Sequence, residues 1–302
     1  MITQQEYLSR RQALIKKLGA DAVVIVRAAT LKTRNHDSHY RFRQQSDFYY
    51  LTGFDEPEAL LVLMSNSEKP YHLFVRPTNE LAEIWDGKRA GQKGAIEDFC
   101  ANKSYSIEDI EKVLPKLLEN KRSVYHLIGE DSELDNSIFR WITALKEKVR
   151  GGVNSPAELI DLKPLLSEMR LFKSEAELEL MRKAADISVQ AHRRLMQVSS
   201  KKSHEYQLEA ELLHEFHHQG CKASAYDSIV ASGANGCVLH YTDNNHPIDE
   251  NGLILVDAGA EYCNYAADIT RTFPAKGRFS PEQKIIYGLV LKAQRAGLAK
   301  VK

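Results

Sequence analysis

The spacing of apolar residues changes several times along the first half of the chain. Residues 4–18 carry apolar side chains at helical spacing and end at Gly19, which predicts an opening helix. Helical spacing returns over residues 106–119 and 132–148. Strand-like apolar runs occupy residues 22–26, 48–51, 59–64, 71–75 and 123–128. Strands with interspersed helices predict an α/β domain in this half of the chain.

The clearest break in the pattern lies at residues 151–156, where Gly, Asn, Ser and Pro gather. We expect residues 157–172 to form a connector and a second domain to begin at Lys173. The sequence therefore predicts two domains, which cover residues 1–172 and 173–302.

Two helices are predicted at the start of the second domain. Ser174 and Glu177 form a capping box, S-x-x-E, before a helix that we expect to run to about Val198. Ser203 is expected to cap a second helix, which ends at Gly220.

Strands and one more helix follow in the second domain. Residues 224–231 predict a strand, and residues 253–273 predict a hairpin. A second capping box at Ser280 and Gln283 begins a helix that has no stop signal before Lys302. We therefore expect the second domain to be incomplete at this residue.

Composition and charge exclude several classes of partner. The chain has 43% hydrophobic and 27% charged residues, and its 41 basic and 41 acidic side chains give a formal net charge of zero. No global positive field for nucleic acid or anionic membrane follows from this balance. The first residues, MITQQEYLSRRQ, lack the apolar core of a secretion signal, and four scattered cysteines indicate reduced thiols. We expect a cytoplasmic protein without a nucleic-acid or membrane partner.

The predicted hairpin within residues 253–273 contains one aspartate on each strand. If its turn centres between Tyr262 and Cys263, Asp257 lies opposite Asp268, and the two carboxylates share one face. Carboxylates held this close repel each other unless a proton or a cation lies between them. Hard divalent cations prefer oxygen ligands, so the pattern indicates a metal site. The alternative is a hairpin with two solvated aspartates.

The hairpin resembles the metal-binding hairpin of the pita-bread metallopeptidases, and is most similar to that of the aminopeptidases P. The resemblance covers the whole chain and includes SDFYYLTGF at 46–54, EIW at 83–85, EMRLFK at 168–173, LHY at 239–241, VDAG at 256–259 and ADITRTF at 267–273. It implies an N-terminal α/β domain of the creatinase/aminopeptidase P type, followed by an incomplete α+β pita-bread catalytic domain.

The resemblance also implies an activity and a cofactor. It implies a metal-dependent exopeptidase that releases the N-terminal residue from peptides with proline second, through a hydroxide that bridges two divalent metal ions, Mn²⁺ by similarity. Asp257 would bind one ion with both oxygens, and Asp268 would bridge the pair. The family also needs a His and two Glu further along. Because the chain stops at Lys302, we expect it to be inactive as given and to associate as a homo-oligomer.

Four further residues are candidates for substrate handling. His240 follows a glycine-punctuated loop and is expected at a strand end, where it could polarise the scissile carbonyl or remain a structural histidine. Tyr226 matches a position near the metal centre of the resembling family. Trp85 and Asp37 match positions that reach a neighbouring subunit's site, although a lone tryptophan is more often packed in a core.

Residues 214–218, HEFHH, formally match the H-E-x-x-H zinc signature. Leu212 and Phe216 belong to the apolar stripe of the same predicted helix, and at about 100° per residue His214 and His218 fall on the opposite, solvated face. A zinc site requires side chains that face a cleft, so we interpret this motif as a solvent-exposed helix face.

Two other functions stay open for the chain: a non-catalytic pita-bread module that binds peptides or mediates assembly, and a prolidase.

Overall fold

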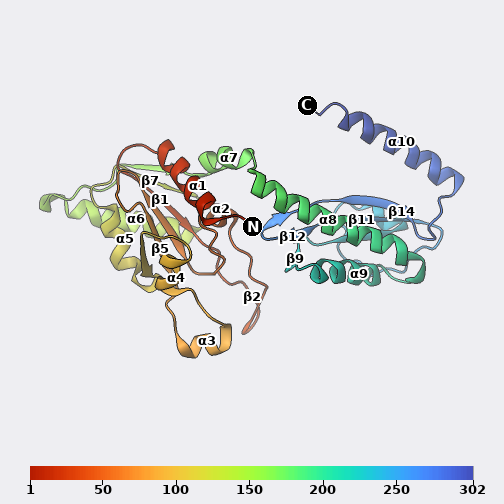
Figure 1. The fold of residues 1–302 in the computed structure, drawn as a ribbon, viewed down its shortest axis with the longest axis horizontal. Coiled ribbons are helices and arrows are strands. Elements are labelled where there is room, and N and C mark those ends of the chain that lie inside the picture. The colour runs from red at the N-terminus through yellow and green to blue at the C-terminus, as the bar shows by residue number, and fades with distance from the viewer. Residues whose placement is uncertain (302) are drawn as a thin grey trace. The chain divides into compact units, whose positions relative to one another are not determined.

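A computed structural model describes residues 1–301, and the chain folds into two compact units. Unit 1 covers Met1–Lys173, and unit 2 begins at Ser174 (Figure 1). The elements of unit 1 are α1 (Gln4–Lys17), β1 (Ala22–Arg27), β2 (Thr33–Asn35), β3 (Ser38–His39), α2 (Ser46–Thr52), β4 (Leu60–Met64), β5 (Tyr71–Val75), α3 (Glu80–Asp86), α4 (Gly91–Glu97), β6 (Lys103–Ser106), α5 (Ile110–Leu118), β7 (Ser123–His126), α6 (Ser132–Glu147), β8 (Glu158–Asp161) and α7 (Lys163–Leu171).

The core of unit 1 is a six-stranded mixed sheet of order β6-β5-β4-β1-β7-β8. The strands β1, β7 and β8 run parallel, whereas β4 pairs with β1 and β5 in antiparallel register. Val24 and Val26 pack in one apolar cluster, while Val23 and Ile25 pack in the cluster on the other face. Because both faces are covered, β1 is apolar along nearly its whole length. The predicted α/β domain is confirmed.

One predicted strand of unit 1 is wrong. The residues at 48–51 belong to the helix α2, not to a strand. The Gln45 side chain accepts a hydrogen bond from the Phe48 amide at 2.6 Å and caps the helix, and Gly53 ends it in the left-handed region with φ of 67°. The aromatic run predicted a strand, but the hydrogen bonds at these two caps stabilise a helix.

The predicted connector at residues 157–172 is also wrong, because it contains regular structure that completes unit 1. Its first part is the edge strand β8, which pairs in parallel with β7, and its second part is α7. Leu162 and Leu166 are fully buried in the core of unit 1. The polar segment at residues 31–45 holds the small exposed hairpin β2–β3.

Unit 2 packs helices against two small sheets. Its elements are α8 (Glu175–Val198), α9 (Glu205–His218), β9 (Ala223–Ser224), β10 (Ile229–Ser232), β11 (Leu253–Asp257), β12 (Ala260–Tyr262), β13 (Tyr265–Ala266), β14 (Thr270–Pro274) and α10 (Pro281–Leu298). The sheets have the orders β10-β11-β14 and β13-β12-β9. Apolar stripes of α8 and α9 form one buried cluster with residues of β11 and β12 (Figure 1). This helix-on-sheet unit agrees with the α+β expectation.

The start of α8 is confirmed and that of α9 is corrected. Ser174 and Glu177 form the predicted capping box, with both reciprocal hydrogen bonds present. The cap position of α9 is occupied by His204, not Ser203. The Ser203 amide instead donates to the Gln207 side chain at 2.9 Å.

The register of the aspartate hairpin differs from the prediction. Asp257 pairs with Thr270, not with Asp268. The turn centres between Cys263 and Asn264, which have φ of 50° and 66°. Positive φ at both central residues defines a two-residue type I′ turn, and asparagine tolerates this region well. The turn therefore lies one residue later than predicted, which shifts the pairing by two residues.

Candidate metal centre

The two aspartates converge on one hydroxyl group in spite of the shifted register. The hydroxyl of Tyr226 donates to Oδ1 of Asp257 at 2.5 Å and lies 3.1 Å from Oδ1 of Asp268. Tyr226 follows β9 by two residues, Asp257 is the last residue of β11, and Asp268 lies in the break between β13 and β14. The structure thus brings together three of the six residues that the sequence singled out.

A break in the strand pairing creates this convergence. The ladder β11–β14 ends at Asp257, and the ladder β12–β13 begins four residues later, at Glu261. At the break a Cβ atom on Gly259 would lie only 1.7 Å from the carbonyl oxygen of Ala267, so the close approach requires glycine. From α8, Nε2 of the buried His192 contacts the Ala258 carbonyl at 3.2 Å and supports this segment.

The arrangement concentrates negative charge. A phenol has one proton, so Tyr226 can donate to only one of the two carboxylates at a time. Burial and the hydrogen bond to Asp257 raise the pKa of the Tyr226 hydroxyl, which keeps it protonated at neutral pH. The second carboxylate therefore faces a like charge without a proton, which is the environment that a cation relieves.

The donor set fits hard divalent cations in kind but not in number. Asp257, Asp268 and Tyr226 present oxygen atoms only, which suit Mn²⁺, Mg²⁺ or Zn²⁺ carboxylate sites. Within residues 1–301, no group of three or more His, Cys, Asp or Glu side chains gathers where it could hold a metal ion. The described side chains thus offer two carboxylate ligands of a larger site.

His240 is not part of the hydrogen-bonded group that Tyr226, Asp257 and Asp268 form in the described chain. It is exposed on a turn after the 3₁₀ helix Gly233–Cys237, not at the end of a strand as predicted. No hydrogen bond or ion pair joins it to Asp257 or Asp268 within the described chain. The glycine-punctuated loop predicted before His240 contains this helical turn, whose first residue, Gly233, adopts φ of 57°.

A buried glutamate that the sequence did not indicate organises the loop that carries His240. The side chain of Glu205, at the start of α9, is fully buried. It accepts hydrogen bonds from the Ser232 amide at 2.7 Å, the Asn235 amide group at 3.0 Å, the Tyr241 hydroxyl at 2.7 Å and the His246 amide at 3.0 Å. Burial and this contact raise the pKa of Tyr241 to about 12. A lone glutamate in the first turn of a helix has no sequence signal for such a role.

The remaining candidates are placed in unit 1, on exposed segments. Trp85 lies on α3 and is 87% exposed, so the core alternative for this tryptophan is excluded within the described chain. Asp37 lies at the turn of the β2–β3 hairpin and is exposed. Both side chains are available to a partner.

The histidine motif on α9 lies on the solvated face, as predicted. His214 and His218 are exposed, and their rings stack with centroids 5.8 Å apart. Leu212 and Phe216 are fully buried on the opposite side of the helix. The zinc interpretation of this motif is therefore not supported by the geometry.

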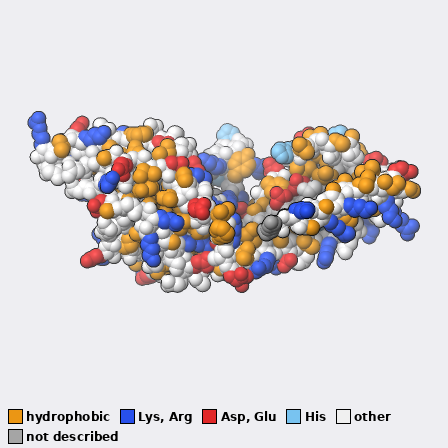
Figure 2. Space-filling model, turned by 90° about the horizontal axis from the view of Figure 1, so that it is seen from above, with side chains coloured by type: hydrophobic (Ala, Val, Ile, Leu, Met, Phe, Trp, Pro, Cys, Tyr) orange, Lys and Arg blue, Asp and Glu red, His pale blue; other side chains and the backbone are white. Residues whose placement is uncertain are grey.

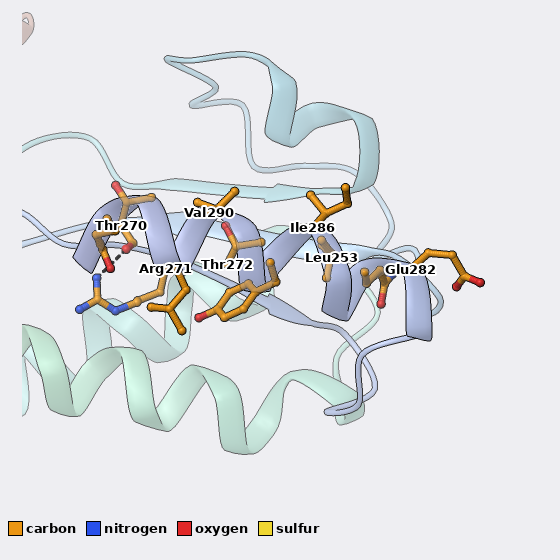
Figure 3. Close-up of a pocket in the computed structure, with 11 residues that line it drawn as sticks. Leu253, Thr270, Arg271, Thr272, Glu282, Ile286 and Val290 are labelled. Carbon is orange, nitrogen blue, oxygen red and sulfur yellow. Dashed lines mark hydrogen bonds between the residues drawn. The ribbon is translucent and has the colours of Figure 1, made fainter. Parts of the chain in front are cut away.

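A groove of about 770 Å³ lies beside the aspartate hairpin, between α10 and the sheet β11–β14. Figure 3 shows side chains from both elements along it, with Thr270 and Arg271 at one end and Leu253 and Ile286 toward the other. None of residues 281–298 is buried.

Acidic and basic side chains are interspersed over the face seen in Figure 2, which agrees with the zero net charge. Among the described helices, none has the length and apolar character needed to cross a membrane.

Comparison with family models supports two assignments. Residues 7–125 match the model of the aminopeptidase P N-terminal domain. Residues 179–302 match the model of metallopeptidase family M24.

Individual relatives give the same result over nearly the whole chain. The chain is 41% identical to the Xaa-Pro aminopeptidase of Escherichia coli K12, over 98% of this chain and 68% of that protein. It is similar to the structure of an aminopeptidase from Pseudomonas aeruginosa, with 46% identity, a TM-score of 0.95, and coverage of 98% of this chain and 67% of that one. It is also similar to the structure of Zn-substituted E. coli aminopeptidase P in complex with product, with 40% identity, a TM-score of 0.95, and coverage of 100% and 69%. The chain thus spans about two thirds of the length of these relatives.

Proposed function

Because this chain belongs to the aminopeptidase P branch of metallopeptidase family M24, we propose that its hairpin is part of a site that hydrolyses the bond before a proline in second position of a peptide. The observation that carries the proposal is the convergence of Asp257 and Asp268 on the Tyr226 hydroxyl. The product of the reaction is the free N-terminal amino acid.

Different residues of unit 2 would bind and orient a dinuclear metal centre. Asp257 and Asp268 would hold two divalent ions, for which Mn²⁺ is our proposal, and Tyr226 would orient the Asp257 carboxylate through its single proton. When bound, the metal ions supply an activated water nucleophile near neutral pH and polarise the scissile carbonyl. Tyr226 restrains the Asp257 carboxylate, and this restraint keeps the remaining carboxylate oxygens available for the ions.

Specificity for proline has a physical basis in the substrate. The X–Pro bond lacks an amide proton and fixes φ near −65°, so subsites that bind an extended backbone do not engage it. We propose that His240 holds the scissile carbonyl oxygen. Trp85 and Asp37 are exposed on unit 1, and we propose that they act on the site of a second subunit in a homo-oligomer. We also propose that the protein acts in the cytoplasm.

The polypeptide of 302 residues is proposed to be inactive when assayed by itself. The described side chains offer two carboxylates to two metal ions, and such ions give up hydration water only for a fuller set of ligands. Titration calorimetry with Mn²⁺ tests this step: we expect weak binding or none. Two ions retained through dialysis, with cleavage of an Xaa-Pro peptide, would overturn it.

The activity itself can be tested in a chimera that continues this chain with the remaining third of the E. coli relative. We expect the chimera to cleave Xaa-Pro peptides, not Xaa-Ala peptides, and to need a divalent metal ion. A folded, metal-loaded chimera that cleaves neither peptide would favour a non-catalytic binding module. Hydrolysis of Xaa-Pro dipeptides alone, without cleavage of longer Xaa-Pro peptides, would favour a prolidase.

A further inference from the structure

The backbone at the break between the two ladders of the hairpin needs partners from outside the hairpin. Ala258 and Ala260 flank Gly259 there, and both alanines are fully buried. The Gly259 carbonyl accepts a hydrogen bond from the Ala225 amide at 2.8 Å. Buried backbone groups are almost always paired, so the other groups of this segment require partners as well.

Two polar side chains of α8 supply such partners. The Ala260 amide donates to Oγ of Ser188 at 2.9 Å, and Nε2 of His192 lies 3.2 Å from the Ala258 carbonyl oxygen. A carbonyl oxygen can only accept, so the contact with His192 requires a proton on Nε2. The helix therefore holds the backbone on both sides of Gly259.

The two side chains reach the segment because they lie one helical turn apart. Residues four apart share one face of an α-helix, and Ser188 and His192 are both buried on that face. The Ser188 hydroxyl also donates to the Ala184 carbonyl at 2.8 Å. Its single proton is thus used within the helix, and only its lone pairs remain for the Ala260 amide.

The start of α8 is also bonded to the hairpin. The hydroxyl of Tyr265 on β13 donates to Oε1 of Glu177 at 2.8 Å, and Glu177 belongs to the capping box that begins the helix. A slide of α8 along the hairpin would break this bond. The positions of Ser188 and His192 along the strands are therefore fixed.

The segment that α8 holds is continuous with both aspartates. Ala258 follows Asp257, Ile269 follows Asp268, and the Ala258 amide donates to the Ile269 carbonyl at 3.1 Å across the hairpin. Burial lowers the pKa of His192, and hydrogen bonding to the carbonyls of Ala258 and Ile269 opposes this effect. The imidazole thus lies against both strands, next to the residues that carry the carboxylates.

We propose that Ser188 and His192 are positioning residues of the metal centre, because the backbone that they hold sets the direction of the Asp257 carboxylate. This role rests on the proposed metal site at Asp257 and Asp268. Removal of groups that orient metal ligands typically lowers metal affinity or activity by about 10–100-fold, since a displaced ligand no longer fits the ion. Neither side chain has to touch an ion or the substrate for this effect.

The first measurement is amide hydrogen exchange by NMR in the chain of 302 residues, which depends on neither metal nor activity. In the double variant Ser188→Ala and His192→Leu, we expect exchange of the Ala258 amide to rise at least roughly tenfold relative to that of Val256, which lies in the adjacent ladder. The single variant His192→Gln keeps a side-chain donor and should keep exchange slow.

The matched control is Ser199→Ala. Ser199 follows α8 and is equally buried, and its hydroxyl donates to the Ala275 carbonyl at 3.2 Å, after the end of β14. Its replacement removes the same kind of bond between the helix and the strands, away from the break. Exchange at Ala258 should stay unchanged in this variant.

The second measurement is Mn²⁺ binding and Xaa-Pro cleavage in the chimera. The double variant should raise the Mn²⁺ dissociation constant about 10–100-fold and lower kcat at saturating Mn²⁺. KM should stay within about twofold, because neither residue binds the peptide. A chimera that binds Mn²⁺ but cleaves no peptide contradicts the proposed function, and the dissociation constants still decide the role of Ser188 and His192. A chimera that binds no Mn²⁺ overturns both proposals.

Three further results would overturn the positioning role. The first is a folded double variant in which Ala258 exchange or the Mn²⁺ dissociation constant stays within about twofold of the parent. The second is an equal rise of exchange at Ala258 and Val256, which marks a general loss of stability. The third is the same set of changes in Ser199→Ala. If the double variant does not fold, Ser188→Ala alone removes one oxygen atom and provides the same test at the Ala260 amide.

Discussion

The hydroxyl of Tyr226 lies 2.5 Å from Oδ1 of Asp257, and it holds this carboxylate next to that of Asp268. Backbone register alone would not have placed the two aspartates together, because Asp257 pairs with Thr270. The side chain of Tyr226, which lies outside the hairpin, therefore brings the two carboxylates to one place.

The first prediction concerns Asp257 in the chimera described above. Asp257→Asn should abolish metal binding and lower turnover by at least roughly a thousandfold, because an amide cannot replace a carboxylate ligand. Metal analysis, Xaa-Pro cleavage and circular dichroism would be measured together. The control is Asp227→Asn, which changes an exposed carboxylate next to Tyr226 and should leave metal content unchanged. Full metal occupancy and activity in Asp257→Asn would refute the hairpin assignment.

Two histidine variants separate the candidates for substrate handling. The double variant His214→Gln and His218→Gln should leave metal content and turnover of the chimera nearly unchanged, since both rings are exposed on α9. His240→Gln should lower turnover while metal content is kept. A tenfold loss in the double variant, about 1.4 kcal/mol in activation free energy, would revive the zinc-helix alternative.

Replacement of Glu205 tests the buried network that organises the His240 loop. Four hydrogen-bond donors point at the two carboxylate oxygens of Glu205. In Glu205→Gln one of these oxygens becomes an NH₂ group, which cannot accept from the donors that face it. We therefore expect a loss of about 2–3 kcal/mol in the free energy of unfolding. Urea unfolding of the 302-residue chain would measure it. The matched control on the same helix is Glu211→Gln, whose ion pairs with Arg194 and Lys202 are near the surface and are worth less than about 1 kcal/mol. Equal losses in both variants would contradict the role of Glu205.

Unit 1 should lose stability in mild acid through His126. Burial lowers the pKa of His126 below its ordinary value of 6.5, although Asp135 and Asp161 act in the opposite direction. The folded state therefore binds fewer protons than the unfolded state near pH 6. This contribution is fully present above the unfolded pKa and is lost as the pH falls through 6.5 toward the folded value.

The measurement is the urea midpoint of unit 1 at pH 8 and at pH 5.5. His126→Gln should reduce the difference between the two midpoints. Part of the difference should remain, because burial also lowers the pKa of His72. The exposed His39 provides the control, because His39→Gln should retain the whole difference. An unchanged pH dependence in His126→Gln would count against the argument.

The apolar face of α10 should cause self-association of the 302-residue chain. Ile286 and Val290 are 62% and 64% exposed, and patches of this kind favour association. Sedimentation velocity should show larger species with rising concentration, and the double variant Ile286→Glu and Val290→Glu should suppress them. Phe139→Glu changes an exposed apolar residue of α6 and serves as the control. A chain that stays monodisperse and monomeric at high concentration would refute this prediction.

The amino-acid sequence by itself determined most of the regular structure. The capping boxes at Ser174 and Ser280 set two helix starts through local hydrogen bonds, and the apolar run of β1 predicted a buried strand. The exposed face of α9 followed from helical periodicity, because the direction of a side chain on a helix depends only on its position. Local patterns of this kind need no partner elsewhere in the chain.

Only the tertiary structure decided the pairings and the site. Residues 46–52 form a helix because Gln45 and Gly53 cap it, and the hairpin turn is centred on Cys263 and Asn264 because both adopt positive φ. The roles of Tyr226 and Glu205 depend on groups more than 25 residues away in the chain. Such contacts arise when distant segments pack together, and no spacing within one segment encodes which partner a buried oxygen will meet.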